Sequence, residues 1–462
     1  MYSGNYSQYM TMEEPGGPVM SRRQLAVLGL ATLGTVGLAP LVGSDRAAAA
    51  TTHRLREIDD QIADLVDDEV DRSIRWLWDF SNDNARSSGY GLVRDRDDSA
   101  AVSSVAATGF ALAAWCIGVE RGVLDRAQVI DRARGSLRSL ERSVPERSGM
   151  LMHFVIPETG AAALNSEYST IDTTLALCGA VVAARFTADP EIVASTSRLL
   201  ERVDWTAYLR RTNRRTYLRM GWSDQDDRFV GTWNMSAEQL CMYLLVAGHP
   251  DVPGATAQAL YRDFNRPVGR YGGDPLVYEP GGALFTYQYS HAFFPFQHWR
   301  DPAGFDWFEN SRRAMLANRS WCRENAAGWP AFEQGLWGSS ANDGIAGYTV
   351  NGAEPCYGRP RNDGTIPPYA LIGALPFVPA EAADALRVLR ARFPQAWGPY
   401  GFCDAVGYRQ GRPWCAGSRL GIDKGLTALS GAAALGSTLV WDSFGSHPWV
   451  ARGRDVLGFT RV

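Results

Sequence analysis

One carboxylate, Glu238, lies between a tryptophan-bearing loop and an apolar run in the stretch T-W-N-M-S-A-E-Q-L-C-M-Y-L-L. Ser236 and Gln239 have the S-x-x-Q spacing of a capping box, which would place Glu238 in the first turn of a helix. An acid there interacts favourably with the helix dipole, by roughly 0.3–1 kcal/mol, and needs no catalytic role. Because the same dipole lowers a carboxyl pKa, a general acid at this position would need a dry pocket or a second carboxylate to stay protonated.

Other acidic residues fall at predicted junctions between loops and helices. Glu167 and Asp172 lie in N-S-E-Y-S-T-I-D, and Asp423 lies in L-G-I-D-K-G. Each of these could serve only to start a helix, and Asp343 and Asp363 precede glycine, as turn formers commonly do. Taken together, the acids indicate a carbohydrate site, because paired carboxylates act on the glycosidic oxygen and on the attacking water.

Aromatic and basic residues near these acids are candidates for sugar binding. The chain has 15 Trp, 18 Tyr and 18 Phe, more than a core alone requires, and many lie in Gly- and Pro-rich loops where rings can stack on sugars. A satisfied core position is the commoner explanation for His291, and a solvated helix face explains Arg312 equally well. The predicted substrate-binding residues are Trp222, Trp233, Tyr289, His291, Arg312, Trp337 and Asp343.

Composition and missing motifs exclude several classes of function. A net charge of -4 with 21% charged residues lacks the basic footprint of a nucleic-acid binder. The sequence has no G-x-S-x-G, no P-loop and no metal-binding Cys or His spacing, so we expect no metal and no cofactor. Residues 95–98 read D-x-D-D, a proton-donor pattern of some terpene cyclases, but four residues in a charged loop are a weak signal.

Residues 1–50 read as an export signal of the twin-arginine type. The segment S-R-R-Q-L at 21–25 leads into an apolar run that ends near residue 42, and A-A-A at 47–49 offers a cleavage site. The apolar run contains Pro40 and is short for a membrane span. We therefore expect a secreted or cell-envelope protein that has no stable membrane anchor once the signal is removed.

The seven cysteines are an odd number for an oxidising compartment. Three lie in apolar helical runs and read as buried thiols: Cys116, Cys178 and Cys241. One disulfide could form among the four cysteines nearer to loops, which are Cys322, Cys356, Cys403 and Cys415.

Helical periodicity dominates residues 51–462, and strand-like alternation is scarce. The predicted helices are 54–80, 103–122, 126–142, 170–187, 190–203, 235–248, 254–266, 284–299, 304–326, 366–376, 380–392, 420–436 and 444–453. Several of them are apolar nearly all round, as the inner helices of a closed toroid would be. We therefore expect an all-α fold, an (α/α)6 barrel in one domain over 51–462, with its long loops gathered at one end.

Eight segments, in order, give the chain a family resemblance: SSVAATGFALAAWCIGVERGVL, SEYSTIDTTLAL, MGWS, QYSHAFF, DWFENSRRAMLANRSWC, WGSSANDG, NDGTIPPYALIGALPF and GIDKG. Together they resemble the glycoamylase-like domain family, which includes bacterial β-1,2-glucanases of the glycoside hydrolase family 144 type. The resemblance extends over about residues 60–450. It implies an (α/α)6 barrel that hydrolyses a β-glucan, most readily a β-1,2-linked one.

The resemblance also implies roles for the acids. The family's general acid is a Glu at the start of a helix that reads Y-S-E-A, and this chain has M-S-A-E, with Glu238 retained in context. A relative in the wider clan uses an aspartate near the C-terminus as general base, which matches Asp423. Another branch uses the Glu of S-E-x-S-T-I-D as nucleophile, here Glu167, and Asp172 in the same motif is a further candidate. Two alternatives stay open: a polysaccharide lyase on an α/α barrel, and a non-catalytic glycan-binding protein.

Overall fold

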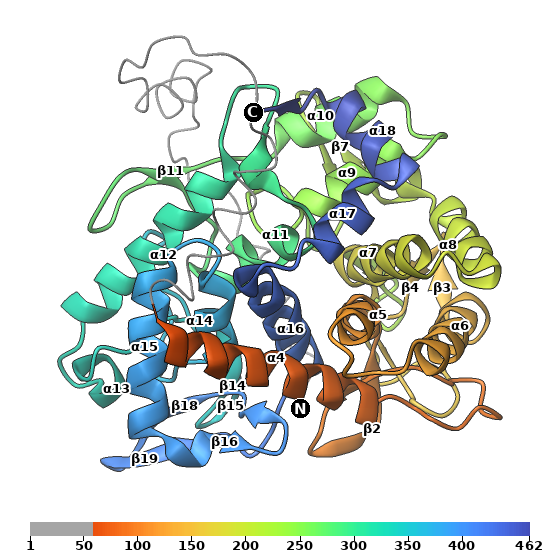
Figure 1. Ribbon diagram of the computed structural model, residues 1–462. Helices are drawn as coiled ribbons and strands as arrows, with labels where there is room; N and C mark the ends of the chain where they lie inside the picture. The colour runs from red at the N-terminus through yellow and green to blue at the C-terminus, as the bar shows by residue number, and fades with distance from the viewer. Residues whose placement is uncertain (1–58) are drawn as a thin grey trace, which may run out of the picture.

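The computed structural model describes residues 59–462, which form a mostly helical fold with small sheets (Figure 1). Along the chain, amphipathic helices alternate with helices that are buried nearly all round. The export signal predicted for residues 1–50 lies outside the described residues.

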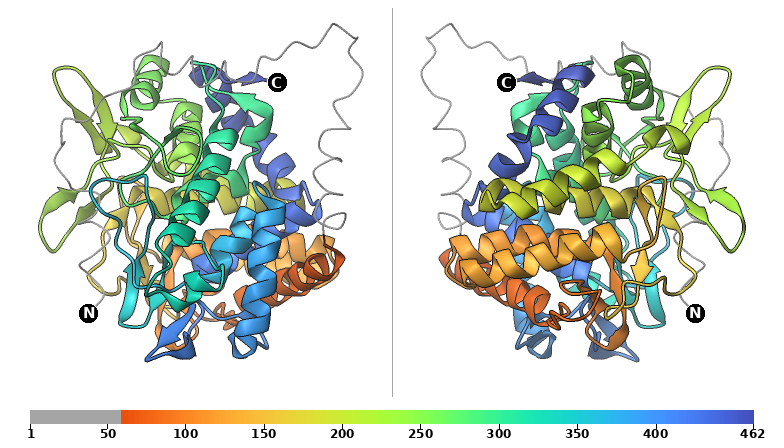
Figure 2. Two further views of the ribbon diagram at one scale, coloured as in Figure 1. Left: turned by 90° about the vertical axis from the view of Figure 1, so that its left-hand side faces the viewer. Right: turned by 90° about the vertical axis from the view of Figure 1, so that its right-hand side faces the viewer.

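The amphipathic helices lie on the outside of the molecule (Figure 1). In α8, the buried residues recur at 192, 195, 196, 199 and 200, which is the spacing of one helical face. The outer helices are α4 (Asp60–Asp79), α6 (Arg126–Arg142), α8 (Pro190–Arg202), α10 (Gly254–Asp263), α12 (Trp307–Glu324) and α15 (Pro379–Arg392). Two of them, α6 and α8, run side by side across one face (Figure 2).

Each outer helix is followed by an inner helix that is apolar on all sides. The inner helices are α5 (Val105–Glu120), α7 (Thr170–Thr187), α9 (Leu240–Gly248), α11 (Tyr289–Phe293), α14 (Pro368–Ala374) and α16 (Gly421–Leu435). The short α13 (Pro330–Glu333) precedes α14, and α17 (Leu439–Gly445) and α18 (Pro448–Leu457) end the helical part of the chain.

The inner helices pack closely on one another. Helix α5 contacts both α7 and α16, so segments from the two ends of the described chain are neighbours in the core. A Cβ on Gly179 of α7 would come within 1.8 Å of the Gly109 carbonyl of α5, and only glycine permits this approach. Although α7 is long and apolar enough to cross a membrane, 83% of its apolar window is buried inside the protein, as a core helix would be.

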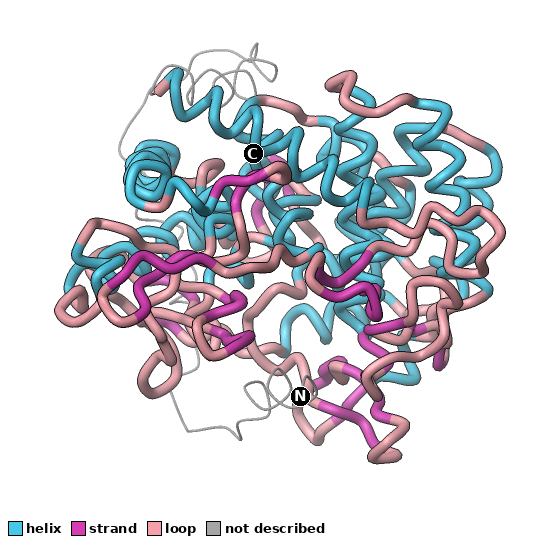
Figure 3. Tube along the Cα trace, turned by 90° about the horizontal axis from the view of Figure 1, so that it is seen from below, coloured by secondary structure: helices cyan, strands magenta, loops and turns pink. Residues whose placement is uncertain are grey.

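Short strands and long loops gather on one side of the molecule, and most of the helices lie on the other (Figure 3). The strands that bear on the site are β1 (Arg94–Arg96), β2 (Ser99–Ser104), β5 (Phe154–Val155), β6 (Tyr168–Ser169), β9 (Gly221–Ser223), β10 (Arg228–Val230), β12 (Leu276–Val277), β14 (Ala341–Gly344), β15 (Gly347–Val350), β18 (Val406–Arg409) and β19 (Arg412–Cys415). The others are β3 (Glu146–Arg147), β4 (Met150–Leu151), β7 (Leu209–Arg211), β8 (Thr216–Leu218), β11 (Val268–Gly269), β13 (Trp299–Arg300), β16 (Trp397–Gly398), β17 (Gly401–Phe402) and β20 (Thr460–Arg461). The pairings between these strands are antiparallel, in sheets of two or three strands.

The structure differs from the sequence-based expectation at three helices. The helix expected over 235–248 begins only at Leu240. The helix expected over 284–299 is broken into the 3-10 turns η2 (Leu284–Tyr287) and η3 (Phe296–His298) on either side of α11. The helix expected over 444–453 is divided because Pro448 begins a new helix, as proline does readily at a first turn.

All seven cysteines lie in the described residues, and all are free thiols. The disulfide that the sequence allows among the four loop cysteines is therefore not formed in this structure.

Candidate active site

Three of the predicted catalytic acids lie at the starts of inner helices. Asp172 occupies the third position of α7, Asp423 the third position of α16, and Glu238 lies two residues before α9. Because an inner helix follows each outer one, these starts come to the same end of the fold. The sequence prediction that these acids mark junctions between loops and helices is confirmed for all three.

The capping box predicted for Ser236 and Gln239 is not formed. Gln239 is the N-cap residue of α9 without a side-chain cap, and its amide group donates instead to the carbonyl of Met235. The start of α9 is held by Ser290, a residue of α11. Its hydroxyl accepts from the Cys241 amide at 3.1 Å and donates to the Glu238 carbonyl at 2.6 Å. A tertiary cap has thus replaced the local one, and it fixes the backbone of Glu238.

The surroundings of Glu238 favour the protonated form of its carboxyl group. Its exposed fraction is 4%, and burial is the main reason that its pKa lies well above the usual range. The nearby carboxylates of Asp172 and Glu279 raise the pKa further, and the cationic His153 opposes them. Glu238 therefore meets the condition for a general acid that the sequence posed, a dry pocket with other carboxylates beside it.

Glu279 is a buried acid that the sequence analysis did not single out. It follows β12 in E-P-G-G, where its carboxylate accepts from the amides of Gly281, at 2.9 Å, and Ala283. Burial raises the pKa of Glu279 to about 7, against these backbone hydrogen bonds.

A second group is formed by His153, Glu167 and Asp172, here called the His153 group. The imidazole Nδ1 lies 3.2 Å from Glu167 Oε1, and Nε2 lies 3.3 Å from Asp172 Oδ1. The second oxygen of Asp172 accepts from the hydroxyl of Ser169, the N-cap of α7, at 2.5 Å. Burial raises the pKa of Glu167, but the neighbouring His153 outweighs it and the net pKa is lowered. Burial raises the pKa of Asp172, opposed by His153, so the two carboxyl groups of the group have pKa values shifted in opposite directions.

The ligand atoms of the His153 group lie within 4.8 Å of one another, a spacing that a cation could bridge. Both ring nitrogens of His153, however, face carboxylate oxygens. A ring that donates on both sides has no lone pair for a metal, so the arrangement fits an ion-pair network.

Asp423 is paired with Asp404, and these two are here called the Asp423 pair. Burial and the neighbouring Asp404 carboxyl raise the pKa of Asp423 well above its usual range, and burial raises that of Asp404 to about 6. Two buried carboxyl groups in contact share a proton, because they cannot both ionise at low cost. Tyr348 lies near these acids, since burial and the carboxyl groups of Asp423, Asp404, Asp95 and Glu238 all raise the pKa of its phenol.

Asp343 lies beside the Asp423 pair but is already engaged. Its carboxylate pairs with Arg96 at 2.5 Å and accepts from Ser418, and its amide donates to Asp404 at 2.6 Å. Arg96 belongs to the D-x-D-D segment, where it also pairs with Asp98 at 2.6 Å. These contacts give the segment a structural role in the walls of the site.

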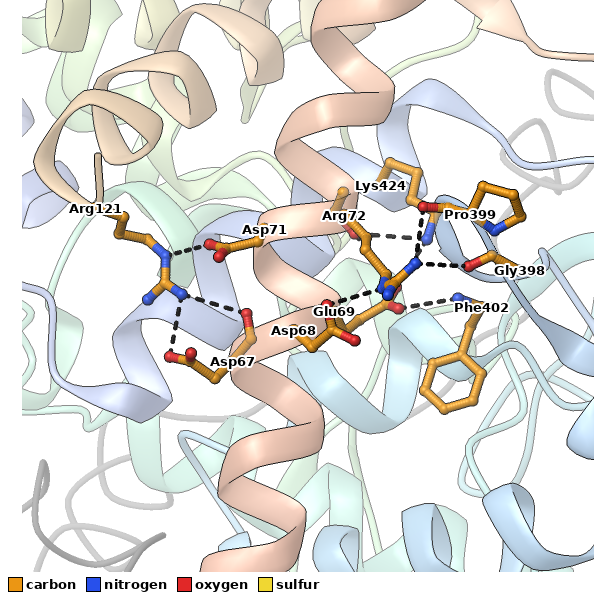
Figure 4. A network of polar contacts seen from close by, with 11 residues as sticks. Asp67, Asp68, Glu69, Asp71, Arg72, Arg121, Gly398, Pro399, Phe402 and Lys424 are labelled. Atoms are coloured by element: carbon orange, nitrogen blue, oxygen red, sulfur yellow. Dashed lines mark hydrogen bonds and ion pairs between the residues drawn. The ribbon is translucent and has the colours of Figure 1, made fainter. Parts of the chain in front are cut away.

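A buried ion pair fastens the start of α16 to α4 (Figure 4). Lys424 Nζ lies 2.7 Å from Glu69 Oε1, and Glu69 Oε2 accepts from the Phe402 amide at 2.9 Å. Ser73 donates to Glu69 at 3.2 Å. Lys424 follows Asp423 directly, so this pair fixes the turn that carries the predicted base.

Two of the predicted subsite tryptophans lie next to the acids. Trp233 is buried, and its Nε1 donates to Thr170 at 2.9 Å, so it supports the start of α7. Trp222 is half-buried in β9, but Arg147 covers its ring at 4.0 Å. Its neighbour Gly221 lies against Glu167, because a Cβ there would come within 3.0 Å of the Glu167 Cγ.

Three other predicted subsite residues are engaged in the core or on their own helix. Trp337 is 1% exposed, and Tyr289 packs edge-on against Phe110 in the core. Arg312 forms an ion pair with Glu309 on its own helix, at 2.7 Å. The part of these residues in sugar binding stays a prediction, and their positions do not favour it.

His291 has the surroundings of a core histidine. Its ring packs against Phe296, Phe308 and Phe377, its Nε2 meets the Ser311 hydroxyl at 3.0 Å, and burial lowers its pKa to about 3. The cavity it lines is bounded by Ser430 and Ala433, at the opposite end of α16 from Asp423. A place for His291 beside the catalytic acids stays a prediction that this position does not favour.

The sequence analysis missed four residues of the site and considered Asp95 only as part of the D-x-D-D segment. The four are His153, Glu279, Tyr348 and Asp404. The available signals were weak, namely an acid before Pro-Gly-Gly for Glu279 and a histidine 14 residues before Glu167.

Comparison with known proteins supports the resemblance described above. Residues 231–448 match the Glycoamylase family model, described as "Putative glucoamylase". The resemblance to the glycoamylase family is therefore confirmed.

Among curated proteins, an exo β-1,2-glucooligosaccharide sophorohydrolase of Parabacteroides distasonis is 25% identical over 88% of this chain. The chain spans 59% of that protein's length. An endo-β-1,2-glucanase from Chitinophaga pinensis, solved with sophorotriose and glucose, has a TM-score of 0.74 at 22% identity. The match covers 86% of this chain and 98% of that one. A structure described as a "putative glucoamylase" from Bacteroides uniformis has a TM-score of 0.73 at 25% identity, covering 86% of this chain and 97% of that one.

Proposed function

We propose that this chain is a glycoside hydrolase that cleaves a β-glucan, with β-1,2-linked glucan as its substrate. One observation carries the proposal: Glu238, whose pKa burial raises well above the usual range, lies beside the His153 group, in which His153 lowers the pKa of Glu167. Environments that separate the pKa values of neighbouring carboxyl groups define the acid and the base of a glycosidase. The β-1,2 linkage is taken from the relatives' names.

In this mechanism Glu238 donates its proton to the glycosidic oxygen as the bond to the leaving sugar breaks. An ionised carboxylate acts on the other face of the sugar ring, as a nucleophile or as a base toward water. Glu167 suits this part best, because its pKa is lowered. Asp172 is the second candidate, because burial raises its pKa against the effect of His153, and Asp423 is the third, because burial and Asp404 raise its pKa well above the usual range.

We further propose that the alternating helices close into an (α/α)6 barrel in one domain. Six outer helices each precede an inner helix, and the last inner helix, α16, packs against the first, α5. Closure explains why the starts of α7, α9 and α16 meet at one end.

We also propose that the protein is exported by the twin-arginine route. A fusion of residues 1–50 to a reporter should leave the cytoplasm, and the double variant Arg22→Lys with Arg23→Lys should keep the reporter in the cytoplasm.

Two other functions would be recognised by different products or by the lack of any product. A lyase would produce unsaturated uronic acids that absorb in the ultraviolet, and a glycan-binding protein would bind sugar without turnover. The test is incubation with linkage-defined glucans (β-1,2, β-1,3, β-1,4 and α-1,4) followed by product analysis. We expect shorter oligosaccharides from the β-1,2-linked polymer alone. Hydrolysis of only α-1,4-glucan, or binding with no product, would overturn the proposal.

A further inference from the structure

His153 lies at the centre of the candidate site, between carboxylates from two separate segments. We propose that His153 is a positioning residue of this hydrolase, a doubly protonated imidazole that keeps Glu167 and Asp172 charged and correctly oriented. This inference rests on the proposed function. His153 is not assigned to the chemical step, because it acts on the sugar only through the carboxylates that it holds.

The first support is the geometry of the two contacts. Nδ1 and Nε2 lie 3.2 and 3.3 Å from one oxygen of Glu167 and of Asp172. A neutral imidazole has only one N–H, so a ring with a carboxylate on each nitrogen can satisfy both contacts only as the imidazolium. With both acids ionised, the two contacts are therefore satisfied together only by the charged ring.

The second support is the way in which the ring is held. The His153 amide donates to the Glu167 carbonyl at 2.9 Å, and the His153 carbonyl accepts from the Val105 amide at the start of α5. The ring stacks on Phe154, with centroids 3.8 Å apart and planes 19° apart. Main chain and ring are thus both fixed, and Glu167 is tied to His153 through its backbone as well as its side chain.

The third support is the charge that faces the ring from each packed segment. Glu167 precedes β6, Asp172 begins α7, Asp95 lies in β1, and Glu238 precedes α9. Burial lowers the pKa of His153, but Asp172, Glu167 and Asp95 outweigh it and raise the net value to about 9. A cation thus lies among four acids and lowers the pKa of each, against the burial that raises it.

The charge on His153 affects the pKa values of the neighbouring acids to different extents. The cation lowers the pKa of Glu167 and opposes the burial that raises the pKa of Asp172, whereas burial dominates at Glu238 and raises its pKa well above the usual range. Without the cation, the acids of the His153 group would protonate at higher pH, and the site would lose its ionised partner near neutrality.

The test compares His153→Gln, which removes the charge, with His153→Lys, which keeps a cation there. For His153→Gln, we expect the acidic limb of the kcat/KM profile on β-1,2-glucan to move up by about 1–3 pH units, as expected when an opposite charge leaves a carboxylate. We expect kcat to fall and KM to change little. The acidic limb of His153→Lys should lie between those of the wild type and His153→Gln. An unchanged limb in His153→Gln would overturn the proposal. His298→Gln is the matched control, because burial and Arg461 lower the pKa of His298.

A second readout does not depend on turnover. In the wild-type protein, the imidazole NMR signal that disappears in His153→Gln should titrate near pH 9, and Glu167→Gln should lower that midpoint. A midpoint at or below 6.5 would contradict the ion-pair network. Loss of activity on chelation, restored by a divalent metal, would also overturn it in favour of a metal site. If wild-type protein cleaves no glucan, the proposed function fails, and the NMR titration still decides whether His153 is the cation.

Discussion

Glu238 illustrates how one residue can satisfy a local pattern and still be governed by its surroundings. A first-turn position would have lowered its pKa through the helix dipole. The structure places it ahead of the helix, buried, with Asp172 and Glu279 as its neighbours, and its pKa is raised. Its protonation therefore comes from the tertiary fold.

A first prediction is that Glu238→Gln makes the protein more stable at neutral pH. The folded pKa of Glu238 lies above its unfolded value. Its stabilising contribution is thus complete below the unfolded pKa and is lost as pH rises through the folded pKa. Glutamine stays neutral throughout, so urea unfolding at pH 5 and pH 8 should show the variant's advantage growing with pH. A loss of stability at pH 8 would indicate that Glu238 has a structural role.

The acids at helix starts could be predicted from sequence, since Glu167, Asp172, Glu238 and Asp423 all stand where a loop meets an apolar run. His153 and Asp404 could not, because their roles depend on partners 14 to 61 residues away. The aromatic residues predicted to bind sugar were less informative, since Trp233 and Trp337 are buried rather than exposed to a ligand. Residue type alone does not separate a stacking ring from a core ring.

At the scale of elements, α9 depends on a neighbour for its first turn. The sequence predicts that Ser236 caps this helix, but Ser290 of α11 does so from across the core. Helix α11 is therefore linked to the start of α9 by hydrogen bonds at Glu238 and Cys241.

A second prediction follows for Ser290→Ala. The variant leaves the Cys241 amide and the Glu238 carbonyl without their buried partner, which should cost about 1–3 kcal/mol of unfolding free energy. Because Glu238 would lose its fixed backbone, kcat should fall as well. Denaturant unfolding and initial rates measure the two effects, with the exposed Ser446→Ala as control. Unchanged values for both would contradict the tertiary cap.

Most helices could be predicted to within a few residues, because one-sided and all-round apolar patterns distinguish outer from inner positions. The breaks in the segment 284–299 could not be predicted, because its apolar residues fit a helical pattern. In the structure, the chain between Gly282 and Pro295 forms only the short η2 and α11. The strands are two to six residues long, too short for alternation to reveal.

At the scale of the whole molecule, the first outer helix and the last inner helix are tied through the pair Glu69 and Lys424. The side chains of both are at most 5% exposed. Taking two charges out of water is costly, and only their mutual contact and hydrogen bonds offset this.

A third prediction is that the two halves of this pair are not independently replaceable. Lys424→Met should destabilise the protein by about 3–5 kcal/mol, because it leaves Glu69 as an unpaired buried charge. The double variant Glu69→Leu with Lys424→Met should recover most of that loss. Chemical denaturation of wild type, both single variants and the double variant measures the coupling, and additive losses would contradict it.

The central claim is that Glu238 supplies the proton for cleavage of a β-1,2-linked glucan. The most direct measurement is the release of oligosaccharides from β-1,2-glucan by wild-type protein and by folded Glu238→Gln, side by side at neutral pH. We predict release by the wild type and a rate about 10²–10⁴ times lower for the variant, the usual contribution of a general acid. A variant that keeps the full wild-type rate would contradict the account.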